Sequence, residues 1–344
     1  MEKPSSLNIS ELANRLGLSV STVSRVINGK ATEYRISEKT QQRVQAALKE
    51  FNYIPNKLAR SLKLDKTETL GLIIPDIANP YFAEISKSIE ATAKTYGYSI
   101  ILCDSDDDIN TEEELLRLML SRKVDGVIIA PVGTSDKHLV KAYQTGLPMI
   151  IIDRFFPESN LPFISSDNFQ GAYDAVQHFI EKGHQRIACI QGIQNSQPNI
   201  ERVRGYKQAL KDNGISFEND YLLGDSFSKE NGFQQLKKLF KMSSPPTAVF
   251  TLSNLLSLGV MEASVEMKLH IPDDFSLISF DEQPYSAYLS TPMTTVNQQK
   301  EKIGSKALEF LVETIDNPEK QQNIQLMMKT KLIIRDSVKR LDGG

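Results

Sequence analysis

The sequence predicts a small all-α module followed by an α/β core of two lobes, each built on a doubly wound parallel sheet. Closely spaced amphipathic helical segments fill the first sixty residues. From residue 70, short apolar runs alternate with amphipathic stretches of about 10–15 residues, which is typical of βαβ units in parallel sheets. The length of 344 residues and the apolar content of 40% suffice for two or three domains with their own cores.

Three short helices are predicted in the N-terminal module. The first begins after Asn8, with a capping-box acid three residues later, and ends at Gly17. The second covers residues 20–28 behind Ser19, a suitable N-cap, and the third begins at Ser37. Each has an apolar stripe on one side, so the three helices are expected to share one small core.

Seven apolar runs of four to six residues predict the strands of the core. Seven strands exceed one compact doubly wound sheet, so we divide the core near residues 165–170. Ligands of such sheets bind beyond the carboxyl ends of the strands, which makes the polar residues that follow each run candidates for a cleft. The runs are Leu70–Ile74, Ser99–Cys103, Val127–Ala130, Met149–Ile152, Ile187–Ile190, Ala248–Leu252 and Phe275–Phe280.

Charge separates the module from the core. Residues 1–64 carry 11 Lys/Arg and 5 Asp/Glu, a net charge of +6, whereas the remaining 280 residues carry 29 and 38, a net charge of −9. No apolar stretch is long enough to span a bilayer and the N-terminus lacks the apolar centre of a signal peptide, so we expect a cytoplasmic protein without membrane contact. Cys103 and Cys189 each close an apolar run and are expected to be buried, reduced thiols.

Longer segments carry a family resemblance. Residues 16–29 read LGLSVSTVSRVING and residues 51–62 read FNYIPNKLARSL, and similar matches continue through residues 70–75, 202–206 and 272–281. Nearly the whole chain resembles the lactose-repressor/galactose-repressor (LacI/GalR) family of bacterial transcriptional regulators. The resemblance implies a core like a periplasmic sugar-binding protein and four parts: a helix-turn-helix DNA-binding headpiece at 1–55, a hinge helix and linker at 56–68, an N-terminal lobe at 69–167 with about 299–327, and a C-terminal lobe at 168–298 with about 328–340.

The second helix matches the recognition helix of the family. A recognition helix presents polar side chains to base edges in the major groove while its other face is buried. Arg25 could read guanine with both arms or only neutralise a phosphate. The turn at residues 30–37 is longer than the commonest version and similar to that of the fructose-repressor and sucrose-repressor branches, which could place Tyr34 or Arg35 near the DNA backbone. By the resemblance, Val20, Ser21 and Arg25 face bases, and Ser19, Thr22, Ser24 and Asn28 hold phosphates.

The hinge, residues 56–62, is too short to be a stable helix by itself and should fold only with a partner. Leu62 matches the family residue that wedges into a minor-groove step, although a plain dimer contact is the alternative. Ala59 and Lys63 would flank it, the cation on a phosphate. Two chains are therefore expected to bind a near-palindromic site on double-stranded DNA as a homodimer.

The resemblance also implies an effector site between the two lobes. A polar small molecule needs donors and a carboxylate acceptor at strand ends, and a sugar or sugar phosphate is favoured. Ser196 and Pro198 stand where purine-responsive members carry other donors, which disfavours a purine corepressor. Salt bridges between the lobes, and a core position for Phe82, remain open alternatives. The candidates are Tyr81, Phe82, Asp153, Arg154, Arg202, Phe227, Asn254, Asp281 and Gln298.

These observations favour a sequence-specific DNA-binding regulator, expected to repress carbohydrate-utilisation genes under the control of that effector. The alternatives are a solute-binding module or a sugar-processing α/β enzyme without a DNA role. No nucleophile elbow, phosphate loop or dinucleotide fingerprint is present, so no catalytic residue and no cofactor are expected. The acidic run at residues 104–108 lacks the glycine and the final acid of a calcium loop, and the four histidines lack ligand spacing, so no metal is expected either.

Overall fold

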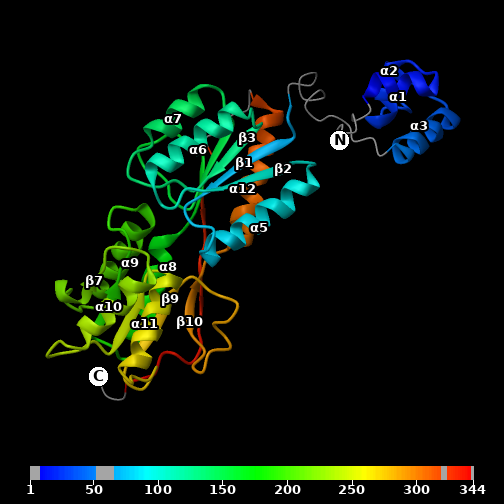
Figure 1. Ribbon diagram of the computed structural model, residues 1–344. Coiled ribbons are helices and arrows are strands. Elements are labelled where there is room, and N and C mark those ends of the chain that lie inside the picture. Colours follow the sequence, from blue (N-terminus) through cyan, green and yellow to red (C-terminus); the bar gives the residue numbers. More distant parts are fainter. Residues whose placement is uncertain (1–7, 52–65, 319–323, 342–344) are drawn as a thin grey trace, which may run out of the picture. The chain divides into compact units, whose positions relative to one another are not determined.

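The computed structural model describes residues 8–51, 66–318 and 324–341. The chain divides into two compact units, Met1–Thr67 and Glu68–Gly344, and each is described by itself. Figure 1 shows the short helices of the first unit and, in the second unit, sheets that are covered by helices. Within the described residues, no helix combines the length and the apolar character that crossing a bilayer requires.

The described part of the first unit contains the helices α1 (Ile9–Leu16), α2 (Val20–Ile27) and α3 (Glu38–Glu50). Asn8 and Glu11 cap the first helix reciprocally, and Gly17 ends it in the left-handed conformation at φ 62°. The side chain of Ser19 accepts a hydrogen bond from the N–H of Thr22 at the start of α2. The three helices share one core, which includes Leu12, Ala13, Val23, Val26, Val44 and Ala47.

The first lobe of the core is built on a parallel sheet in the order β11-β5-β4-β3-β1-β2. Its strands are β1 (Thr69–Ile74), β2 (Ser99–Asp104), β3 (Gly126–Ile129), β4 (Met149–Ile152), β5 (Phe163–Ser166) and β11 (Gln325–Met328). Its helices are α5 (Pro80–Thr95), α6 (Ile109–Ser121), α7 (Lys137–Gln144) and α12 (Lys300–Asp316).

Both faces of this sheet are buried, as a doubly wound sheet requires. Leu70, Leu72 and Ile74 of β1 pack with α5 and α12, whereas Ile73 packs on the opposite face with residues of α6 and α7. Because both faces are buried, the strand is apolar at nearly every position. This continuous apolar run is the pattern that predicted β1 from the sequence.

The second lobe repeats the plan in the order β12-β10-β9-β8-β6-β7, parallel except for the antiparallel pair β10–β12. The strands are β6 (Ile187–Ile190), β7 (Leu222–Leu223), β8 (Ala248–Thr251), β9 (Ser276–Phe280), β10 (Thr294–Asn297) and β12 (Lys331–Ile333). The helices are α8 (Asn168–Glu181), α9 (Gln197–Asp212), the short 3-10 helix η1 (Asn219–Tyr221), α10 (Lys229–Leu239) and α11 (Asn254–Glu266).

Within the part of the chain that the structure describes, the backbone passes between the lobes at three short links. Asp167 separates β5 from α8, residues 298–299 separate β10 from α12, and residues 329–330 separate β11 from β12. Parallel strands point their carboxyl ends to the same edge of a sheet, so the polar residues after the strands gather at that edge. One sequence-based expectation needs correction, because Cys103 on the edge strand β2 is only partly buried while Cys189 is fully buried.

Candidate functional site

Residues from both lobes of the core meet around Tyr81. This tyrosine lies in the first turn of α5, and its hydroxyl donates to Oδ1 of Asp153 over 2.8 Å and lies 3.3 Å from Oε1 of Gln298. Asp153 directly follows β4 of the first lobe, whereas Gln298 follows β10 of the second. The structure therefore brings three of the predicted effector residues into direct contact.

Gln298 extends this contact to the second lobe. Its Nε2 donates to Oδ1 of Asp281, the residue that follows β9. The second carboxylate oxygen of Asp281 accepts the backbone N–H of Asn254 at 3.4 Å, at the N-terminus of α11, where a partial positive charge favours an anion. Tyr81, Asp153, Gln298 and Asp281 are all nearly inaccessible to water, so one buried chain of polar groups crosses between the lobes.

Arg202 adds a buried cation from α9. Its Nε donates to Oδ1 of Asn168 over 2.8 Å and its Nη1 donates to the carbonyl of Leu252 over 2.6 Å. The guanidinium lies over the ring of Phe280, 3.7 Å from its centroid. These contacts fix the plane of a group whose remaining N–H donors suit hydroxyl or anionic oxygens.

The electrostatics of the cluster follow from burial. Burial raises the pKa of the Asp153 carboxyl above its ordinary value, while the cations Arg154 and Arg202 oppose that rise. Burial first, and then the carboxylates Asp153 and Asp281, hold the pKa of the Tyr81 hydroxyl well above its usual range. Tyr81 therefore stays a hydrogen-bond donor at any physiological pH, and the two acids offer acceptors in a dry site.

Three predicted effector residues have other surroundings. Arg154 pairs with Asp107 at 2.9 Å and is held at the edge of the first lobe. Phe82 is 5% exposed and belongs to the apolar core, and its ring centroid lies 5.0 Å from that of Tyr81 in an edge-to-face arrangement. Phe82 therefore occupies the core position that the sequence left open as an alternative. Phe227 packs against the core of the second lobe, directly over Gly192.

Sequence reasoning named Asn254 at this edge but missed three other amides, Asn79, Asn168 and Asn199. Asn254 Nδ2 donates to Oδ1 of Asn79, the N-cap of α5, at 3.3 Å, and Asn254 Oδ1 is without a partner among the described residues. Asn168 and Asn199 are buried as well. The side-chain oxygen of Asn168 accepts a hydrogen bond from Arg202, and that of Asn199 accepts one from the N–H of Gly192. An amide in the first turn of a helix after a strand is the signal that could have found them.

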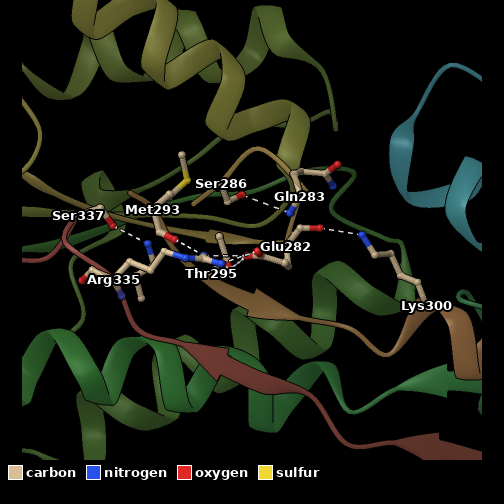
Figure 2. Close-up of polar contacts among 9 residues, drawn as sticks. Glu282, Gln283, Ser286, Met293, Thr295, Lys300, Arg335 and Ser337 are labelled. Atoms are coloured by element: carbon tan, nitrogen blue, oxygen red, sulfur yellow. Dashed lines mark hydrogen bonds and ion pairs between the residues drawn. The ribbon is translucent and has the colours of Figure 1, made fainter. Parts of the chain in front are cut away.

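The loop after Asp281 is held by a separate polar network (Figure 2). The guanidinium of Arg335 donates to both carboxylate oxygens of Glu282, at 2.6 and 3.0 Å, and the hydroxyl of Thr295 donates to the same carboxylate. Nζ of Lys300 donates to the carbonyl of Glu282 over 2.7 Å and pairs with Glu84 of α5 at 2.8 Å. Figure 2 shows the side-chain amide of Gln283 pointing away from this network, and both of its polar atoms lack a partner among the described residues.

The first unit presents a second candidate site on α2. Val23 and Val26 are buried, whereas Val20, Ser21 and Arg25 are exposed. The residues predicted to hold phosphates make contacts of their own: Ser19 caps the helix and contacts the hydroxyls of Ser21 and Thr22, and Asn28 donates to the carbonyl of Ser24 over 2.7 Å. Tyr34 and Arg35 are exposed on the turn after α2. The hinge residues predicted at 56–62, with Ala59, Leu62 and Lys63, lie outside the described residues.

Comparisons with known proteins address the whole chain. The family described as "Bacterial regulatory proteins, lacI family" matches residues 8–56, and "Periplasmic binding proteins and sugar binding domain of LacI family" matches residues 67–335. Curated relatives include HTH-type transcriptional repressors PurR. The one from Photobacterium profundum is 33% identical over 337 residues, covering 97% of this chain and 99% of the relative, and one from Histophilus somni is 32% identical over 335 residues with the same coverage.

Solved structures agree in fold. The lac repressor dimer bound to operator and the anti-inducer ONPF is 25% identical with a TM-score of 0.87, covering 98% of this chain and 100% of that one. The regulator CelR in complex with cellobiose is 27% identical with a TM-score of 0.73 and coverages of 97% and 100%. A LacI family regulator from Enterococcus faecium with bound ribose is 30% identical with a TM-score of 0.71 and coverages of 80% and 100%. The chain is a member of the LacI family of bacterial regulatory proteins.

Proposed function

We propose that this LacI family member is a repressor of carbohydrate-utilisation genes whose effector, a sugar or sugar phosphate, binds between the two lobes of the core. The supporting observation is the buried chain of Tyr81, Asp153, Gln298 and Asp281, in which groups from both lobes satisfy one another. An effector that enters the cleft would replace these mutual contacts with contacts to itself.

The chemistry of the cluster suits a polyol. Two buried carboxylates accept hydrogen bonds from hydroxyl groups, and Arg202 and the amides of Gln298 and Asn254 can donate to hydroxyl oxygens. Two solved relatives were obtained with the sugars cellobiose and ribose, which supports the same ligand class here. An anionic phosphate would find its cation in Arg202.

At the DNA end, we propose that α2 reads an operator through Val20, Ser21 and Arg25 in a homodimer. The solved lac repressor complex, a dimer on its operator, supports this arrangement. The hinge at residues 56–62, with Leu62 as the wedge, stays part of the proposal. The effector then acts by linkage: it shifts the DNA-binding equilibrium only through its difference in affinity for the two states of the core.

A thermal-shift panel on the full-length chain tests the ligand class, with sugars, sugar phosphates and purine nucleobases as separate arms. A ligand at about 100 times its Kd stabilises the folded state by about 2.7 kcal/mol, which is enough for a measurable rise of the melting temperature. We expect one sugar or sugar phosphate to raise the melting temperature of the wild type. The control variant Asp220→Asn, which changes an exposed carboxylate of the second lobe, should show the same rise. Asp281→Asn should lose the rise.

Two other outcomes would contradict the proposal at different points. A response to nucleobases alone would reject the carbohydrate class. If Asp281→Asn abolished that response, the proposed site would still hold. A sugar response that survives in both Asp281→Asn and Arg202→Met would place the ligand elsewhere. Melting curves of the unliganded variants verify that each one folds.

A further inference from the structure

The exposed arginine of α2 is stacked on the turn that follows the helix. The guanidinium carbon of Arg25 lies 3.8 Å from the centroid of the Tyr34 ring. Both side chains are at the surface, and Tyr34 is 44% exposed. Among the described residues, the Arg25 guanidinium makes no hydrogen bond and no ion pair, so the tyrosine ring is the group that orients it.

The backbone holds this ring in a fixed place relative to Arg25. The N–H of Lys30 donates to the carbonyl of Arg25 itself over 2.9 Å, and the N–H of Tyr34 donates to the carbonyl of Lys30 over 3.2 Å. Ala31, 5% exposed, anchors the same turn in the headpiece core, and its carbonyl accepts the N–H of Ile36 at 2.8 Å. Two hydrogen bonds and one buried side chain therefore connect Tyr34 to the helix that carries Arg25.

Stacking constrains an arginine without using its donors. The side chain of a free arginine samples many rotamers, and binding a base must suppress them. A ring against one face of the guanidinium restricts that freedom, while the N–H groups, which lie in the guanidinium plane, stay available for the two acceptors O6 and N7 of a guanine. A stacked Arg25 is thus pre-organised for bidentate recognition.

We infer that Tyr34 is a positioning residue that sets the base specificity of Arg25, in place of the contact with the DNA backbone that its sequence position suggested. The inference rests on the proposed sequence-specific DNA binding. It assigns a purpose to the lengthened turn at residues 30–37: the turn supplies the ring beside the recognition helix.

Selection from a randomised duplex library tests this assignment with the full-length protein. Wild type, Tyr34→Phe, Tyr34→Leu and Arg25→Met each enrich their preferred duplexes, and Kd values are then measured on the wild-type duplex and on a scrambled one. Because Phe keeps the ring and removes the hydroxyl, Tyr34→Phe should select the wild-type sequence. Tyr34→Leu should lose preference at the same base pair of each half-site as Arg25→Met and bind the selected duplex about 5- to 30-fold more weakly, with two headpieces contributing.

Controls separate stacking from simple charge effects. Arg35→Gln removes a neighbouring cation from the same turn. It should weaken binding to the selected and the scrambled duplex by the same factor and leave the selected sequence unchanged. In the double variant Arg25→Met/Tyr34→Leu, the second change should add almost nothing to the first, since both remove one coupled pair.

Three results would overturn the inference. In the first, Tyr34→Leu loses the same affinity for both duplexes, selects an unchanged sequence, and Tyr34→Phe shows a similar loss. That result would identify the Tyr34 hydroxyl as a contact with the DNA backbone. Tighter binding by Tyr34→Leu would show that the stack withholds Arg25 from DNA. Failure of the wild type to enrich any sequence would reject the proposed DNA specificity itself, and the positioning role with it.

Discussion

Two aspartates of the candidate effector site share an unusual backbone conformation. Asp153 and Asp281 end a central strand in the first and second lobe respectively, and both are left-handed, at φ 64° and 77°. A residue with a side chain adopts this conformation at a cost of about 1 kcal/mol, which the surrounding structure must offset. The sequence marked both residues by their place after an apolar run, but no glycine or asparagine signalled the turn. This strain is visible only in the folded chain.

A buried histidine makes the stability of the core depend on pH. His184 is inaccessible to water, its Nδ1 lies 2.9 Å from the hydroxyl of Thr247, and its Nε2 lies 3.1 Å from the carbonyl of Lys339 in the C-terminal segment. Burial lowers the pKa of His184 from its ordinary value of 6.5 to about 4. Between these two values the unfolded chain binds a proton that the folded chain does not, so stability is lost as the pH falls.

We therefore expect the free energy of unfolding to fall by about 1–2 kcal/mol between pH 7.5 and pH 5 because of this residue. Urea titrations at the two pH values measure the change. In His184→Gln the pH-dependent loss should shrink by that amount, whereas His270→Gln, whose imidazole side chain is 76% exposed, should keep it. Equal pH dependence in His184→Gln and the wild type would contradict the assignment.

At the level of elements, a run of apolar residues decided which strands could be predicted. The seven predicted apolar runs correspond to β1–β4, β6, β8 and β9, of which all but the edge strand β2 are largely buried. The remaining strands escaped the pattern: β7 has only two residues, and β11 alternates exposed and partly buried side chains. Thr294–Asn297, which forms β10, is polar because it lies beside the polar network of Figure 2. Short or polar strands exist through their sheet neighbours, which a local sequence window does not contain.

Helices α10 and α11 cross through two glycines, and this crossing gives a prediction of definite sign. A Cβ on Gly259 would lie 1.9 Å from the carbonyl oxygen of Lys229, and one on Gly232 would lie 2.1 Å from that of Leu256. Helix propensity alone favours alanine over glycine by up to about 1 kcal/mol. Backbone overlap opposes it, because neither helix can yield without repacking the core.

Gly259→Ala should therefore lower the free energy of unfolding by about 2–3 kcal/mol, measured by urea denaturation. Val265→Ala on the same helix is the matched control, since Val265 is 78% exposed and should change stability by less than about 0.5 kcal/mol. Stabilisation by Gly259→Ala would show that propensity dominates and that the two helices are not in close contact.

At the level of the whole molecule, the contacts that join the lobes divide into two kinds. Gln298 joins Tyr81 to Asp281 within the candidate effector site, so an effector would compete for these groups. Lys300, 6% exposed, joins Glu84 of the first lobe to the carbonyl of Glu282 in the second. The residues of the first kind follow from family resemblance and strand ends. Lys300 could not be predicted, because its partners lie on two other elements far along the chain.

The Lys300 link should oppose the entry of an effector. In the described state the candidate effector residues satisfy one another, so a ligand must separate groups that Lys300 helps to hold together. We expect Lys300→Met to raise the affinity for the sugar or sugar phosphate identified in the thermal-shift panel. The hydrogen bond between the lobes, from the Lys300 ammonium to the Glu282 carbonyl, contributes about 0.5–1 kcal/mol, which corresponds to a two- to five-fold lower Kd in titration calorimetry.

Glu84→Gln removes the ion pair that orients Lys300 within the first lobe, and it separates this effect from direct ligand contact. Because Glu84 reaches the second lobe through Lys300, both single variants should raise the affinity, and the double variant should exceed neither by more than about two-fold. Weaker effector binding in Lys300→Met with no change in Glu84→Gln would instead identify the ammonium group as a ligand contact. By linkage, the variants that raise effector affinity should change operator affinity in the same sense as the effector itself, which a binding titration on the selected duplex measures.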